Sequence, residues 1–190
     1  MKTNGSFLIR NFSTNVCFGL IGLLIICSAP VFSQNTGFYS FLPNSDGVID
    51  RKGFDIGYAM IYSQWDLNSN GEITETEFLE TIFNRLDQNQ DGTLAANEWA
   101  VAQKYLFEGL VTSGKNEFKN FDSNGDKNMS KEEFMKGVKA MGLFGYFDIN
   151  GDGKLSLREI CYRVFNQMDL DNNGTIDQKE FSKVNKLFIN

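Results

Sequence analysis

Histidine is absent from this 190-residue chain, and proline occurs only twice. Without imidazole, the chain lacks the usual general base and the commonest side-chain ligand of transition metals. Two prolines and no long low-complexity run favour a helical chain over a loop-rich one. We therefore expect no enzyme, since only an active site built from carboxylates alone would be compatible with this composition.

Cysteine is also scarce, and two of the three cysteines lie near the N-terminus. There Lys2 and Arg10 precede an apolar run over residues 16–27, and small side chains follow at the positions that signal peptidases require. The segment therefore predicts a signal peptide over residues 1–33, cleavage before Gln34, and a secreted or periplasmic protein.

Two other interpretations of this segment stay open. An uncleaved membrane anchor would need a longer apolar run, and the bulk of Ile26 disfavours lipid attachment at Cys27. Cleavage would leave Cys161 as the single cysteine, so no intramolecular disulfide could form. It would also remove two positive charges from a formal net charge of −6, which leaves −8. We expect such a chain to bind no nucleic acid and to have no stable membrane insertion.

A pattern of twelve residues recurs through the rest of the chain. It has Asp at position 1, Asn or Asp at positions 3 and 5, an apolar residue at position 8 and Glu at position 12. Ca²⁺ takes roughly six to eight oxygen ligands, which such a loop supplies from alternating side chains, one backbone carbonyl and a bidentate Glu. Helix capping and Asx-turns could explain one copy, but not five. The five copies are loops II (66–77), III (87–98), IV (122–133), V (148–159) and VI (169–180).

These loops resemble those of the EF-hand family of calcium-binding proteins, and the likeness covers nearly the whole chain after residue 33. The resemblance implies an all-α fold, Ca²⁺ as the cofactor, side-chain ligands at positions 1, 3, 5 and 12, and a backbone carbonyl ligand at position 7. In loop III, Ala95 at position 9 leaves that coordination place to water. Carried over position by position, the ligands are Asp66, Asn68, Asn70, Glu72 and Glu77; Asp87, Asn89, Asp91, Thr93 and Glu98; Asp122, Asn124, Asp126, Asn128 and Glu133; Asp148, Asn150, Asp152, Lys154 and Glu159; and Asp169, Asp171, Asn173, Thr175 and Glu180.

Two copies depart from the pattern. Loop IV has Lys127 at position 6, where the family has glycine, so a side chain must occupy a sharp bend and we expect the weakest of the five sites. An upstream copy, loop I (42–53), has Leu42 at position 1 and Gly53 at position 12. Because both anchoring carboxylates are lost, we interpret loop I as a scaffold that pairs with another loop, with a weak ion site as the alternative.

Apolar residues recur at fixed offsets from every loop, which places them on one face of the adjoining helices. We expect them to form the core, since an apolar helix face usually packs inward. A groove that opens to a target peptide is the alternative. The residues are Phe38, Tyr62, Phe83, Phe118, Phe144 and Phe165 four places before position 1; Phe41, Trp65, Leu86, Phe121, Phe147 and Met168 one place before it; and Phe54, Phe78, Trp99, Phe134, Ile160 and Phe181 one place after position 12.

The loops form two similar halves of three, offset by 80 to 82 residues, which indicates a tandem internal duplication. We predict a first half over residues 34–110, a linker over 111–116 and a second half over 117–190. Only nine residues separate loop II from loop III and loop V from loop VI, too few for two helices and a turn. Short shared helices should therefore join these loops, one within residues 75–87 and one within 157–169.

Calcium binding by about five loops is the function that these residues predict, and two roles stay open. In one, Ca²⁺ is a structural ion that stabilises the fold and a partner-binding surface, as in dockerin-like interaction modules. In the other, the chain is a calcium sensor or buffer that exposes an apolar groove to a target peptide. The sequence identifies no protein or peptide partner.

Overall fold

The computed structural model describes residues 38, 41, 44–105 and 117–186. The predicted signal peptide (1–33), the predicted linker (111–116) and position 1 of loop I lie outside these residues. The described chain is mainly helical, as predicted. Its helices are α3 (Arg51–Tyr62), α4 (Glu75–Leu86), α5 (Ala96–Tyr105), the 3₁₀ turn η1 (Phe118–Asn120), α6 (Lys131–Ala140), α7 (Leu143–Phe147), α8 (Leu157–Met168) and α9 (Gln178–Lys186).

Each helix that follows a loop begins at the tenth position of that loop. In three loops, the position-9 hydroxyl accepts from the N–H of the position-12 Glu, whose carboxylate accepts from the position-9 N–H. This capping box satisfies two N–H groups at the helix start. The pairs are Thr74 with Glu77, Ser130 with Glu133, and Ser156 with Glu159. The Glu that the pattern assigns to a metal ion therefore also sets where the helix begins.

Helices α4 and α8 confirm the prediction of shared helices. Each is one uninterrupted helix of 12 residues that leaves one loop and enters the next. The link between loops IV and V is different, because it contains two helices, α6 and α7, with a turn between them at Met141 and Gly142. Gly142 has a φ of 73°, a left-handed conformation that glycine adopts without steric cost.

Short strands pair the loops in a nested order that the sequence left open. The strands are β1 (Ile49–Asp50), β2 (Ile73–Thr74), β3 (Thr93–Leu94), β4 (Met129–Ser130), β5 (Lys154–Leu155) and β6 (Thr175–Ile176). They form three antiparallel ribbons, β1 with β6, β2 with β5 and β3 with β4. Loop I thus pairs with loop VI, loop II with loop V, and loop III with loop IV. Every ribbon joins one predicted half to the other.

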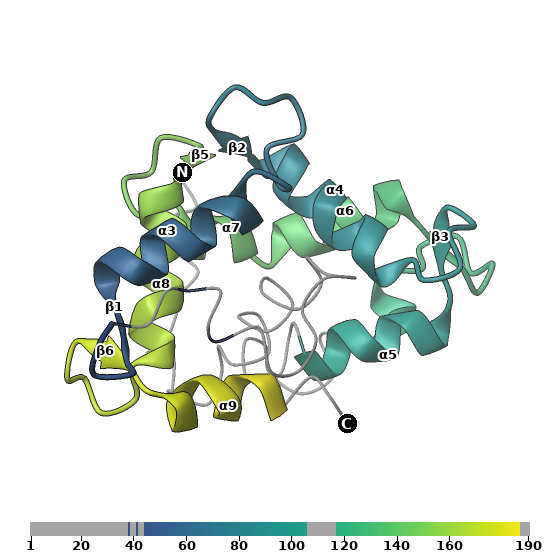
Figure 1. The fold of residues 1–190 in the computed structure, drawn as a ribbon. Helices are drawn as coiled ribbons and strands as arrows, with labels where there is room; N and C mark the ends of the chain where they lie inside the picture. The colour runs from purple at the N-terminus through teal and green to yellow at the C-terminus, as the bar shows by residue number, and fades with distance from the viewer. Residues whose placement is uncertain (1–37, 39–40, 42–43, 106–116, 187–190) are drawn as a thin grey trace, which may run out of the picture.

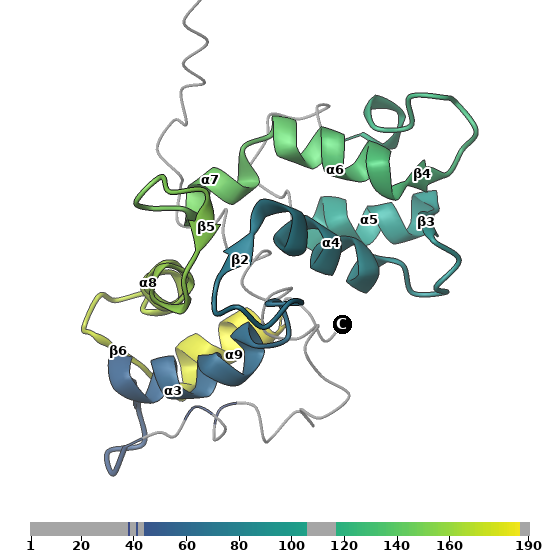
Figure 2. The ribbon, with the colours of Figure 1, turned by 90° about the horizontal axis from the view of Figure 1, so that it is seen from above.

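The chain passes the three ribbons in order through β1, β2 and β3, which we call the outward path. It then passes them in the reverse order through β4, β5 and β6, which we call the return path. Helices α3 and α8 run in opposite directions between the β1–β6 and β2–β5 ribbons and pack against each other. Helix α4, on the outward path, packs against α6, on the return path. The ribbons lie at separate corners of the molecule (Figure 1), and α4 lies beside α6 in both views (Figure 2). The two predicted halves are therefore interlocked along their length.

The core is one continuous apolar cluster inside this arrangement. With the exception of Phe118, which is partly buried against the cluster, all the aromatic and aliphatic residues at the three predicted offsets are buried. The prediction that these stripes form the core is confirmed. No helix in the described part of the chain is both long enough and apolar enough to cross a membrane.

Two aromatic contacts that join the predicted halves use equivalent positions of the loop pairs III–IV and I–VI. Phe83 of α4 packs edge-on against Phe134 of α6, and Phe165 of α8 packs in the same way against Phe54 of α3. The ring centroids are 5.6 and 5.4 Å apart. All four residues are fully buried, so these contacts hold the outward and return paths together.

Candidate metal centres

Five loops share one backbone conformation. In loops II to VI, positions 4 and 6 both have positive φ, between 57° and 87°. This left-handed conformation is free of steric cost only for glycine. Position 4 is Ser69, Gln90, Gly125, Gly151 or Asn172, and position 6 is Gly71, Gly92, Lys127, Gly153 or Gly174. Lys127, with a φ of 70°, takes the bend that the sequence predicted for it.

The Asp at position 1 is fixed by the backbone of its own loop. In loop II, Asp66 accepts from the N–H of Asn70 at 3.0 Å and from the N–H of Gly71 at 2.7 Å. The same contact from the position-6 N–H to Oδ2 of the position-1 Asp occurs in the other four loops, at 2.9 to 3.0 Å. The turn therefore directs position 1 inward in every copy.

The Glu at position 12 closes each loop from the other end. In loop V, Oε1 of Glu159 accepts from the N–H groups of Ile149 at 3.0 Å and Asn150 at 3.2 Å, and Oε2 accepts from the N–H of Ser156 at 3.0 Å. In loop IV, the Ser130 backbone N–H and the Ser123 and Ser130 hydroxyls lower the pKa of Glu133 to about 2. Such a carboxylate stays ionised across the physiological pH range.

The side chains brought together offer only oxygen atoms from carboxylates and amides, which suits a hard cation such as Ca²⁺. In loop VI, carboxylate oxygens of Asp169, Asp171 and Glu180 all lie within 4.8 Å of one another. The residues present therefore fit Ca²⁺, and those that would hold it are the ones predicted at positions 1, 3, 5, 7 and 12.

The loops differ in how far they bury these anchors. Positions 1 and 12 are buried in loops II, III and VI, with 4 to 8% of each residue exposed. In loop IV, Asp122 and Glu133 are both only partly buried, and in loop V Asp148 is partly buried while Glu159 is buried. Loop IV thus combines a lysine in a left-handed bend with the most open pair of anchors.

Loop I keeps part of the turn, the left-handed residue at position 6, without the anchors. Asn44 Oδ1 accepts from the N–H groups of Asp46 and Val48, and Gly47 has a φ of 75°. Asp50, at position 9, caps α3 by accepting from the N–H of Gly53 at 2.7 Å. The predicted pairing of this loop with another is confirmed, because β1 pairs with β6 of loop VI.

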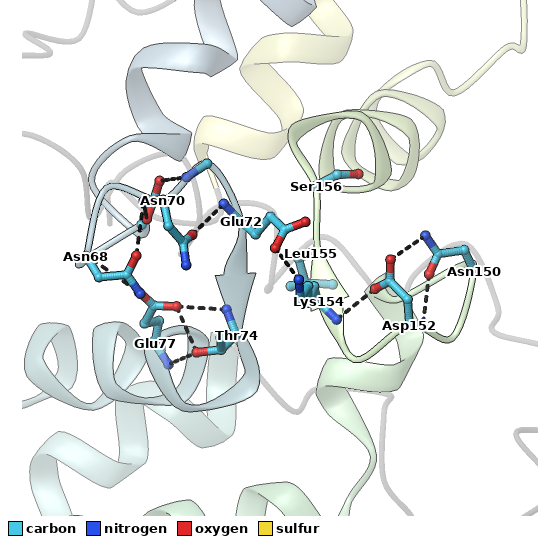
Figure 3. A network of polar contacts seen from close by, with 12 residues as sticks. Asn68, Asn70, Glu72, Thr74, Glu77, Asn150, Asp152, Lys154, Leu155 and Ser156 are labelled. Carbon is cyan, nitrogen blue, oxygen red and sulfur yellow. Dashed lines mark hydrogen bonds and ion pairs between the residues drawn. The ribbon is translucent and has the colours of Figure 1, made fainter.

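Two contacts in the β2–β5 ribbon, which we call the central ribbon, were not predicted from the sequence. Glu72 and Lys154, at position 7 of loops II and V, form an ion pair across the ribbon (Figure 3). The Tyr62 hydroxyl lies 2.9 Å from the carbonyl oxygen of Gly71 and 2.7 Å from that of Leu155. Burial, followed by the nearby Asp66 and Glu72 carboxylates, raises the pKa of Tyr62 to about 12. Once loops II and V are known to pair, opposite charges at the same position would have indicated the ion pair.

Comparison with known families gives two matches that overlap these loops. A model described as an EF-hand domain pair matches residues 79–164, and a model described as an EF hand matches residues 162–185. Together they reach from α4 to α9, more than half of the chain. The chain belongs to the EF-hand calcium-binding family. Loops III to VI lie within the matched residues, and Ca²⁺ is the cofactor of the family.

Similar proteins come from plants and animals. The chain is 26% identical over 137 residues to a probable calcium-binding protein, CML25, of Arabidopsis thaliana, covering 57% of this chain and 73% of that protein. It is 28% identical over 108 residues to the guanylyl cyclase inhibitory protein of Lithobates pipiens, covering 56% and 52%. It is 27% identical over 104 residues to human guanylyl cyclase-activating protein 3, covering 54% and 47%. The matches thus span about half to three quarters of each relative.

Proposed function

We propose that this EF-hand protein binds Ca²⁺ in five loops, II to VI, and that the ions serve mainly to stabilise its fold. The observation that carries the proposal is the common conformation of these loops, with left-handed residues at positions 4 and 6 and with the carboxylates of positions 1 and 12 held by the loop backbone. Loop I has a left-handed residue at position 6 but not at position 4, and it lacks both carboxylates, so it acts as a scaffold for loop VI. The same residues support ion binding and give no indication of catalysis.

The nested pairing supports a stabilising role. Each ribbon joins two loops that are distant in sequence, so an ion that orders one loop also orders the place where the two halves meet. Without ions, acidic side chains crowd inside the loops of a chain with a formal net charge of −6, and their repulsion opposes the compact state. An ion that binds the folded state alone stabilises it by about 1.4 kcal/mol when its free concentration is tenfold above the dissociation constant.

A location outside the cytoplasm belongs to this proposal. It is supported by the N-terminal sequence, in which two basic residues precede an apolar run. N-terminal sequencing of the protein recovered from its native host should give Gln34 as the first residue. An intact Met1 would contradict both cleavage and export by this route.

A calcium sensor is the second candidate, because two of the relatives are named for regulating guanylyl cyclase. A sensor of this kind would expose apolar surface to a target when it binds calcium. The binding of an apolar dye distinguishes the two roles. Dye fluorescence should fall when calcium is added to a structural protein, because the ions complete its core, and it should rise for a sensor.

A calorimetric titration of the full chain with calcium tests the number of sites. About five ions should bind at millimolar calcium, the range in which many extracellular modules bind, and loop IV should fill last. Substitution of Glu77, Glu98, Glu159 or Glu180 by Gln should each weaken or remove one site. The matched control is Glu75→Gln, which makes the same chemical change in loop II at position 10, where the family places no ligand. Six equivalent sites, or fewer than four, would refute the proposal.

A further inference from the structure

The central ribbon differs from the other two in the residues at position 7. Loops III and IV have Thr93 and Asn128 at this position, and loops I and VI have Val48 and Thr175. Loops II and V have Glu72 and Lys154, whose side chains form an ion pair (Figure 3). The two opposite charges therefore meet at one corresponding position of two paired loops.

Position 7 is also where the family pattern takes a backbone carbonyl as a ligand. Glu72 directly precedes β2 and Lys154 is the first residue of β5, and the register sets Thr74 opposite Lys154 and Ile73 opposite Leu155. A side-chain contact between them joins the two residues whose carbonyls would face the two ions. The Tyr62 hydroxyl, within hydrogen-bonding distance of carbonyls in both loops, is a second link.

The charges at position 7 also differ in their effect on each loop. Loop II has carboxylates at only two of positions 1, 3, 5 and 12, Asp66 and Glu77, whereas each of loops III to VI has three. Glu72 therefore adds negative charge to the loop with the fewest ligand carboxylates. Loop V has three, and Lys154 adds positive charge beside them. Each charge thus offsets the other near both sites.

We propose that the Glu72–Lys154 ion pair couples the calcium sites of loops II and V, so that removing either charge changes the affinity of both. This inference rests on the proposed function of these two loops. The Glu72 side chain is 46% exposed and that of Lys154 49%, so the coupling is electrostatic, depends on salt and makes little difference to folding.

Nuclear magnetic resonance of the full chain can follow each loop separately. The amides of Gly71 and Gly153 donate to Asp66 and Asp148, so their resonances should shift when an ion engages those carboxylates. At low salt, Glu72→Gln leaves the charge of Lys154 unopposed. It should weaken calcium binding in loops II and V, as reported by the two glycine amides, by about threefold. Lys154→Gln should strengthen binding at both by a similar factor. The double variant should return to within twofold of the original chain.

Two controls separate coupling from the general effect of charge. Glu75→Gln removes the same charge from loop II at position 10, where the side chain pairs with a lysine of α6 instead of with loop V. This variant should shift the calcium midpoint reported by the Gly71 amide and leave the midpoint reported by the Gly153 amide nearly unchanged. The exchange Glu72→Lys with Lys154→Glu restores an ion pair and should bring both midpoints back within twofold. If each single variant moves only its own loop, or if neither moves any midpoint, the inference is wrong. If neither glycine responds to calcium in the original chain, the proposed function of these loops fails instead.

Discussion

At the scale of single residues, loop IV keeps the common turn with a lysine at position 6, and we predict that this side chain weakens its site. Lys127 has a φ of 70°, and its N–H still donates to Asp122 at 3.0 Å, so the loop keeps its turn. A residue with a Cβ in this conformation costs about 1 to 2 kcal/mol relative to the right-handed one. The lysine also brings a positive charge to a loop that must attract a cation.

Two substitutions at this residue should separate strain from charge. Lys127→Gly should stabilise the calcium-free protein by about 0.5 to 1 kcal/mol, a net value because glycine also gains freedom in the unfolded chain. Lys127→Gln, the matched control, removes the charge but keeps the strain. Both should tighten calcium binding in loop IV at low salt, and only the glycine variant should raise the midpoint of urea unfolding without calcium. Equal unfolding midpoints for the two variants would show that the bend is not strained.

At the scale of the elements, one close contact recurs beside loops I and IV. The α-carbon of Gly57 in α3 faces the ring of Phe41, and that of Gly137 in α6 faces the ring of Phe121. A Cβ built on Gly137 would lie 2.2 Å from the Phe121 ring, and one on Gly57 would lie 2.6 Å from the Phe41 ring. Each glycine therefore lets the phenylalanine that precedes its loop pack against the helix that follows.

Alanine should have opposite effects at two helical glycines. Gly137→Ala gains helix propensity but forces a methyl group into a buried ring, so we expect a net loss of roughly 1 to 3 kcal/mol. A Cβ at Gly145 in α7 meets nothing within 4 Å. Gly145→Ala should therefore stabilise the protein by up to about 1 kcal/mol. Chemical denaturation in calcium measures both, and stabilisation by Gly137→Ala would contradict the described packing.

The shared helices and the buried stripes could be predicted from the sequence, because spacing alone limits what nine residues can form and which side chains share a face. The ligand positions within each loop were equally accessible, since a turn around a cation requires particular residues at fixed intervals. The partner of each loop was not accessible. The strands Ile73–Thr74 and Lys154–Leu155 are too short to specify a register by pattern, and their pairing depends on the path of the whole chain.

At the scale of the whole molecule, the ribbons join segments 34–110 and 117–190 three times. Produced as two separate chains, these segments should associate one to one in calcium and separate in chelator, because each alone leaves three loops unpaired and its apolar stripes uncovered. Sedimentation or light scattering measures the assembly. Pairing of two copies of one segment would set Glu72 against Glu72 or Lys154 against Lys154, so the mixed complex should dominate. Two stable, folded monomers in calcium would refute the interlocked arrangement.

The nested ribbons also favour one order of folding. Loops III and IV are closest in sequence, so their ribbon closes the shortest loop of chain at the lowest entropic cost, and each later ribbon closes a span already shortened by the one before. A chain emerging from the ribosome has to hold loop I unpaired until loop VI, its partner, has been synthesised. The first and last loops of the growing chain therefore stay unpaired until the β1–β6 ribbon forms. Any truncation before loop VI leaves loop I without a partner.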